Sequence, residues 1–136
     1  MKPILLDTCA LIWLANGAPM SASAMELLGE AEPVDGAIAV SPISAWEIGL
    51  LVGRGRLVLK LDPRDWFHKA LDAGITLAAM PPEVLIASSF LPPSELRDPA
   101  DRIIAATARA FGYRVMTRDA PLLAFGTAGQ LEAIAC

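Results

Sequence analysis

Four acidic residues stand at predicted strand ends or in predicted helices. Asp7 closes the apolar run PILLD and Asp119 closes YRVMTRD, whereas Glu47 lies in an apolar predicted helix and Asp101 in the first turn of another. Carboxylates that converge repel one another, so a cluster of four needs a positive charge to offset it. Hard divalent cations such as Mg²⁺ and Mn²⁺ take oxygen ligands. These residue types therefore predict a metal site, provided that the fold brings them together.

Such a site indicates phosphodiester hydrolysis. One or two bound divalent cations can generate hydroxide near neutral pH and hold a phosphodiester for in-line attack. The chain has one His and two Cys, too few for a convincing zinc set. Hydrolysis at a carboxylate-bound cation needs neither a serine nucleophile nor a histidine base.

Each acid also has a simpler interpretation. Asp7 and Asp119 could each be the N-cap of the next helix, and Glu47 could be a surface glutamate. The helix around Glu47 is apolar almost all round, and a buried carboxylate without a partner is costly. Glu47 therefore needs a cation or a water-filled pocket, and the coincidence of two strand-end aspartates favours the functional interpretation.

The stretch DPAD divides between two tasks. Asp98 is predicted to cap a helix, with Pro99 at the first helical position and Asp101 at the third. At helical spacing Asp98 falls on the side of Arg102 and Arg109, a predicted solvent stripe, while Asp101 lies at the edge of the apolar stripe and faces inward. The positive end of the helix dipole is expected to help keep Asp101 ionised for a metal.

The elements that must position these acids alternate between strands and helices. Strands are predicted over 3–7, 36–41, 75–80, 113–119 and 131–136, helices over 8–16, 21–32, 42–53, 62–74, 81–91, 98–112 and 120–126, and a short edge strand or extended loop over 57–61. Uninterrupted apolar strands alternating with helices indicate a parallel sheet covered on both faces. Ligands bind beyond the carboxyl ends of such strands.

Composition sets the class of protein. The 136 residues predict a single domain over 1–136, and 54% hydrophobic residues with a mean hydropathy of +0.49 predict a large core and an apolar surface for a partner. No apolar run approaches the roughly 20 residues of a membrane span. The amino terminus carries an Asp inside its apolar stretch and does not resemble a signal peptide, so a cytoplasmic protein is expected.

Cys9 is expected to be buried and Cys136 to be a frayed terminal thiol, without a disulfide.

The net charge of −4 excludes a basic footprint over the whole molecule. Eight of the eleven basic residues are Arg, the better residue for bidentate phosphate contacts. Six lie close in sequence to the proposed site and are candidates either for phosphate contacts or for a solvated rim: Arg54, Arg56, Arg97, Arg102, Arg114 and Arg118.

Four motifs in order resemble one known family. LLDTCALIWL, SPISAWEIGL, RDPADRIIAATAR and VMTRD are similar to the successive motifs of PIN-domain ribonucleases, closest to the VapC-type toxins of type II toxin–antitoxin pairs. The resemblance covers nearly the whole chain. It implies a three-layer α/β/α sandwich with a central parallel sheet, Mg²⁺ or Mn²⁺ as cofactor, endonucleolytic cleavage of RNA, and a cognate antitoxin as partner.

The resemblance also assigns residues. The matching motifs make Asp7, Glu47, Asp101 and Asp119 the metal-binding and catalytic residues. Ser44 and Thr117 match hydroxyls that support the ligands, and the role of Asp98 stays open. An inert PIN-like module that binds protein or RNA is the main alternative. A phosphoaspartate signalling domain is a weaker one, because no Lys follows Lys69.

Excess hydrophobicity predicts a partner surface. Leu11, Trp13 and Leu14, with the helix around Met25–Leu28, could form a groove for an antitoxin helix or a contact in a homodimer. Core packing is the alternative for any single one of these residues. His68 is expected to be a solvated helix residue, not a catalytic base.

Overall fold

The computed structural model describes residues 2–136, which form five strands and seven helices. In chain order they are β1 (Ile4–Leu6), α1 (Thr8–Ala15), α2 (Ala22–Ala31), β2 (Ile38–Val40), α3 (Pro42–Gly53), α4 (Pro63–Asp72), β3 (Thr76–Leu77), α5 (Pro82–Ala87), α6 (Pro99–Phe111), β4 (Arg114–Thr117), α7 (Ala120–Thr127) and β5 (Glu132–Ala135).

All strands are parallel, in the order β3-β2-β1-β4-β5. In the centre, Leu5 of β1 is in register with Ala39 of β2 and Val115 of β4. The chain runs outward from β1 through β2 to β3, then returns to the other side of β1 as β4. The strand order therefore reverses between β1 and β4, and that point is where open α/β sheets bind ligands.

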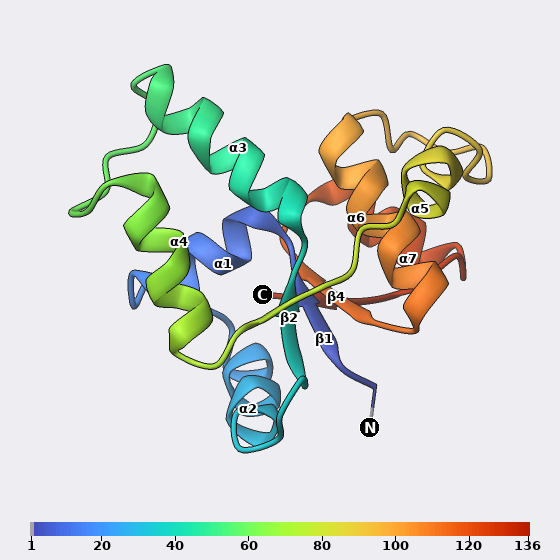
Figure 1. The fold of residues 1–136 in the computed structure, drawn as a ribbon. Helices are drawn as coiled ribbons and strands as arrows, with labels where there is room; N and C mark the ends of the chain where they lie inside the picture. Colours follow the sequence, from blue (N-terminus) through green and yellow to red (C-terminus); the bar gives the residue numbers. More distant parts are fainter. Residues whose placement is uncertain (1) are drawn as a thin grey trace.

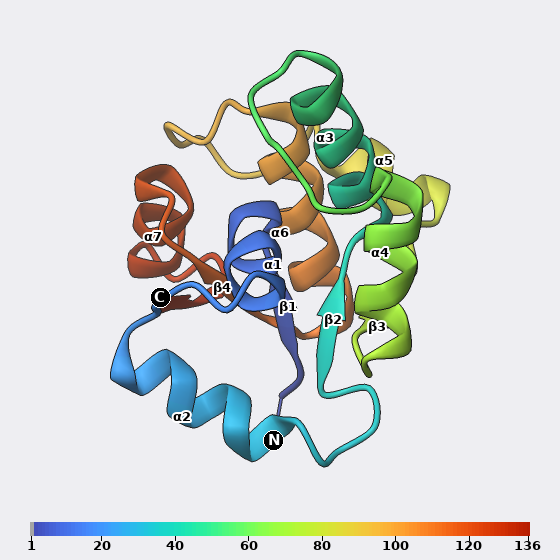
Figure 2. The same ribbon diagram turned by 90° about the vertical axis from the view of Figure 1, so that its left-hand side faces the viewer.

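The sheet lies between two layers of helices (Figures 1 and 2). Ile4 and Leu6 face one layer and belong to a core shared with α1, α2 and α4, whereas Leu5 faces the other and packs with Ile104 of α6. Alternate residues of a strand point to opposite faces, so a strand buried on both faces is apolar throughout. This confirms the predicted three-layer α/β/α sandwich.

The outer elements are shorter than expected. β3 covers only Thr76–Leu77, both exposed, because it is an edge strand paired with β2 alone. The predicted helix over 81–91 stops at Ala87, where the Ser88 hydroxyl donates to the Leu85 carbonyl oxygen at 2.6 Å. Residues 57–61 form a loop, not a strand.

Two further expectations are wrong. Cys9 is exposed and Cys136 is buried, the reverse of the prediction; both are free thiols. Arg102 is not part of a solvent stripe: it is half-buried, and its guanidinium donates to the carbonyl oxygens of Ser88 and Leu96 at 2.8 and 2.7 Å. Arg102 therefore ties the 88–97 loop to α6.

Within residues 2–136, no helix is long and apolar enough to cross a membrane.

Candidate active site

The two strand-end aspartates lie at the point where the strand order reverses. Asp7 directly follows β1, and Asp119 follows β4 after one intervening residue. Both are N-caps, since Asp7 Oδ1 accepts from the Ala10 amide at 2.8 Å and Asp119 Oδ2 from the Leu122 amide at 3.0 Å. The capping interpretation is therefore confirmed for both, and it fixes two carboxylates side by side at the carboxyl edge of adjacent strands.

A threonine hydroxyl joins these two aspartates. Thr117, fully buried at the end of β4, donates to Asp7 Oδ2 at 2.5 Å and accepts from the Asp119 amide at 2.9 Å. Asp7 itself is only 4% exposed. Burial raises the pKa of Asp7, and the bond from Thr117 opposes that rise. The structure thus gives Thr117 the supporting contact that the sequence indicated.

Glu47 reaches the same edge from α3. Its Oε1 accepts from the hydroxyl of Thr8, and Thr8 Oγ1 lies 2.9 Å from the hydroxyl oxygen of Ser44. Burial raises the pKa of Glu47, the Thr8 bond lowers it, and Asp98 and Asp7 raise it further. Sequence reasoning named Ser44 but missed Thr8. The available signal was a hydroxyl immediately after the strand-end aspartate.

Asp101 completes the set from the first turn of α6. Asp98 caps that helix as predicted, accepting from the Asp101 amide at 3.0 Å. Burial first, and then the carboxylates of Asp98, Asp119, Glu47 and Asp7, raise the pKa of Asp101 to about 8. Burial and four negative neighbours therefore oppose the expected effect of the helix dipole on Asp101. That the dipole helps to keep Asp101 ionised for a metal stays a prediction.

The four predicted acids lie close enough together to influence one common group, the Cys9 thiol. Each of them raises the pKa of the Cys9 thiol, which reaches about 11, after the larger effect of burial. Across residues 2–136 the ion pairs are Lys2 with Glu132 and Arg64 with Asp62, so no basic side chain neutralises the cluster. As they stand, no three His, Cys, Asp or Glu side chains of this part of the chain form a set that could hold a metal ion.

The donor chemistry nevertheless fits a hard cation. The cluster offers carboxylate oxygens, it lacks a basic partner, and its hydroxyls orient the carboxylates of Asp7 and Glu47. Oxygen-rich sites of this kind suit Mg²⁺ and Mn²⁺. The four carboxylates are close enough to affect one another electrostatically. In this arrangement of side chains they do not form a complete set of metal ligands.

The arginines near the site divide into two groups. Arg114 and Arg118 are engaged with backbone carbonyl oxygens, as Arg102 is, and Arg118 also lies 3.9 Å above the Trp13 ring. Arg54, Arg56 and Arg97 are exposed. Arg97 directly precedes Asp98, the cap of α6.

A groove of about 900 Å³ lies elsewhere, between the end of α1, α2, the 58–61 loop and α4. Met25, Val34, Val58 and Leu61 line it although each is between 42% and 90% exposed. Leu14, Met25 and Leu28 lie in it as expected. Two residues proposed for the groove do not line it: Leu11 is fully buried in the core, and Trp13 packs beneath Arg118.

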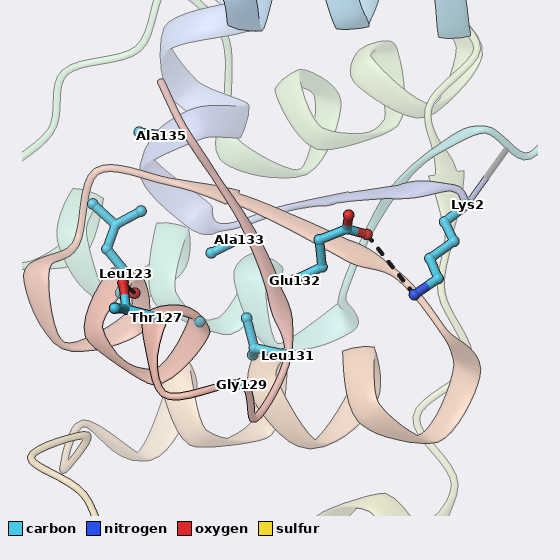
Figure 3. Close-up of a pocket in the computed structure, with 9 residues that line it drawn as sticks. Lys2, Leu123, Thr127, Gly129, Leu131, Glu132, Ala133 and Ala135 are labelled. Carbon is cyan, nitrogen blue, oxygen red and sulfur yellow. Dashed lines mark hydrogen bonds and ion pairs between the residues drawn. The ribbon is translucent and has the colours of Figure 1, made fainter.

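A smaller pocket of about 670 Å³ lies between α7 and β5. Figure 3 shows Lys2 paired with Glu132 at one end, and Leu123, Leu131 and smaller residues such as Ala133 around the rest. Glu132 is the only acid in its lining, and it is paired. This pocket therefore lacks the unneutralised carboxylates of the strand-end cluster.

Comparison with known proteins agrees with this arrangement. The PIN domain family model matches residues 4–126. The chain is 32% identical over 120 residues, 88% of both sequences, to Ribonuclease VapC22 of Mycobacterium tuberculosis. Its fold is similar to chains in two DNA-bound complexes: VapBC2 from Rickettsia felis (TM-score 0.67, 16% identity, 97% of this chain and 98% of that one) and VapBC from Salmonella typhimurium (0.66, 17%, 99% and 98%). The chain belongs to the PIN-domain family, as a VapC-type member.

Proposed function

We propose that this protein is the toxin of a type II toxin–antitoxin pair, a Mg²⁺- or Mn²⁺-dependent endoribonuclease. The observation that carries the proposal is the cluster of Asp7, Glu47, Asp101 and Asp119, whose charges act on one another without a basic partner. Family membership and the similarity to a VapC ribonuclease support it. A toxin of this kind acts on RNA in the cytoplasm.

Each acid has a task in the proposed reaction. Asp7, Glu47, Asp101 and Asp119 would hold the cation, directly or through water, and a bound cation would lower the pKa of a water and offset charge on the phosphodiester. Thr117 keeps Asp7 in place. Asp98 caps α6 and so fixes the turn that carries Asp101. Arg97, exposed beside that cap, meets a phosphate of the RNA.

The test is cleavage of a purified RNA by the purified chain in MnCl₂ and in excess chelator. We expect fragments in MnCl₂, none in chelator, and none from Asp101→Asn under either condition. Cleavage that survives the chelator contradicts the metal dependence. A wild-type chain that binds RNA in MnCl₂ without cleaving it would favour the inert binding module.

A second part of the proposal concerns the antitoxin. Two solved structures of similar fold are VapBC complexes, and the groove between α2 and α4 leaves apolar side chains exposed. Amphipathic helices bind such grooves through regularly spaced apolar residues. Lys60 and Lys69 line the same groove, and Glu32 is the one acid in its lining, so the charged part of the lining is basic on balance. The partner segment is therefore an amphipathic helix with acidic residues beside its apolar face, supplied by the antitoxin.

A third part concerns self-association, and we propose a homodimer. Outside the groove, the exposed large apolar residues include Trp46 on α3 and three residues on or just after α5: Leu85, Ile86 and Phe90, the last 81% exposed. Both helices lie at the same end of the molecule (Figures 1 and 2). A second copy covers these side chains in the proposed dimer. Exposed apolar area of this kind marks interaction sites.

A further inference from the structure

Thr8 occupies an unusual position in the acidic cluster. It is the first residue of α1, directly after Asp7, yet its hydroxyl contacts α3 and not its own helix. Two side chains of α3 meet it: Glu47 Oε1 accepts from Thr8 Oγ1, and Ser44 Oγ lies 2.9 Å from the same oxygen. Ser44 and Glu47 are three residues apart and so share one face of α3.

Proton counting fixes the direction of these bonds. An ionised carboxylate only accepts hydrogen bonds, and a threonine hydroxyl has a single proton to give. Thr8 gives that proton to Glu47, so the proton between Thr8 and Ser44 must come from Ser44. The chain Ser44 to Thr8 to Glu47 therefore runs one way. Ser44 is fully buried and Thr8 is 5% exposed, which keeps water from competing for these bonds.

We propose that Thr8 is a positioning residue for Glu47, holding one carboxylate oxygen so that the other is presented to a divalent cation. Thr117 holds Asp7 in the same manner from the other side of the cluster. Groups that orient metal ligands typically account for about 10–100-fold in metal affinity. This inference rests on the proposed function, because it assigns Glu47 as a ligand.

The experiment compares Thr8→Val with Thr8→Ser in the full-length chain. Valine keeps the branched shape and removes the hydroxyl, whereas serine keeps the hydroxyl and removes the methyl group. We expect Mn²⁺ binding, measured by calorimetry without RNA, to weaken at least about ten-fold in Thr8→Val and to stay within about three-fold of wild type in Thr8→Ser. The Mn²⁺ concentration for half-maximal RNA cleavage should rise in parallel, with the KM for RNA unchanged.

Thr107→Val is the matched control. Thr107 is also a buried threonine, but its hydroxyl donates to the Ile103 carbonyl oxygen within α6 and touches no carboxylate. Thr107→Val should bind Mn²⁺ like wild type. Equal Mn²⁺ affinity in Thr8→Val and wild type overturns the inference, as does a loss in Thr8→Ser that equals the loss in Thr8→Val, which would indicate a packing role only.

Two safeguards separate the possible failures. If Thr8→Val does not fold, Ser44→Ala removes the donor that orients Thr8, and Mn²⁺ binding should weaken in the same direction, by about three- to ten-fold; no change overturns the inference. If wild type neither binds Mn²⁺ nor cleaves RNA, the proposed function fails and the inference with it. If wild type binds Mn²⁺ and cleaves RNA, and Thr8→Val does both equally well, the inference is overturned and the proposed function stands.

Discussion

The acidic edge of the sheet and the groove between α2 and α4 are built in opposite ways. At the edge, the carboxylates of Asp7 and Glu47 are buried or half-buried and each accepts a threonine hydroxyl. In the groove, Met25 and Val58 are 48% and 90% exposed, and apolar side chains line a hollow of about 900 Å³. One region is polar, enclosed and internally bonded; the other is apolar and open.

This difference indicates what each region contributes to the protein. Burying carboxylates beside one another is unfavourable for the isolated chain, and burial and the neighbouring carboxylates raise the pKa of Asp101. Exposed apolar side chains cost solubility and add little to the fold. Neither arrangement is explained by folding alone. The edge is therefore suited to a cation and the groove to a protein partner, and substitutions should affect them independently.

Asp7→Asn should have the largest effect. We expect RNA cleavage in MnCl₂ to fall at least about 1000-fold, since a metal ion contributes several kcal/mol to the transition state. Asparagine caps helices as well as aspartate does, and it removes a charge whose burial is unfavourable. Asparagine has a single acceptor oxygen, however, so it cannot keep both the Ala10 and the Thr117 hydrogen bond, and the free energy of unfolding should change by no more than about 1 kcal/mol in either direction. Antitoxin binding should be unchanged. Asp35→Asn, exposed between α2 and β2, is the control.

The groove should respond to the opposite kind of change. Met25→Glu combined with Val58→Glu should weaken binding of the proposed antitoxin by about 100-fold, because buried apolar anchors dominate such interfaces. Cleavage by the free chain should be unchanged. Phe111→Glu is a matched control, since Phe111 is 46% exposed against 48% for Met25 and lies outside the groove. Equal affinities for both proteins would contradict the assignment of the groove.

Local signals in the sequence were sufficient to predict most of the acidic edge. Asp98 caps α6 as expected because its signal, Asp-Pro followed by an acid three residues after the cap, lies within four residues. The parallel sheet also follows from local patterns. Asp7 and Asp119 were found because each ends an apolar run, and their convergence needed only the rule that parallel strands end at the same edge.

The contacts that could not be predicted depend on how each helix is rotated about its own axis and on partners that lie far away in the sequence. α1 is apolar on every side, so its sequence does not say that Leu11 faces the core and Leu14 the groove. Thr8 bonds to residues 36 and 39 positions away. Cys136 belongs to the core cluster that includes α1 and α2, and its carbonyl oxygen accepts from the amide of Ser21, far away in the sequence.

The apolar surface around α5 gives a third prediction. Ile86→Glu combined with Phe90→Glu should weaken the proposed homodimer by about thirty-fold or more, seen as a shift to monomer in sedimentation velocity, because each substitution places a charge in a desolvated contact. The variant with Glu at positions 25 and 58 should sediment as wild type. A wild-type chain that is monomeric throughout would remove the homodimer from the proposal while leaving the nuclease intact.

The smallest effect is expected at Gly126 of α7, which lines the pocket between α7 and β5. A Cβ there would come within 2.7 Å of the Ala133 Cβ, closer than real contacts allow, so Gly126→Ala must push α7 away from β5. We expect a loss of about 1–2 kcal/mol in the free energy of unfolding, measured in urea. Gly49→Ala, in α3 with nothing within 4 Å of the added carbon, should instead gain up to about 1 kcal/mol.

Since Asp119 caps α7, Gly126→Ala should also lower cleavage several-fold and leave antitoxin affinity unchanged. A variant that lost antitoxin binding and kept full cleavage would mean that α7 supports the groove and not the acidic edge.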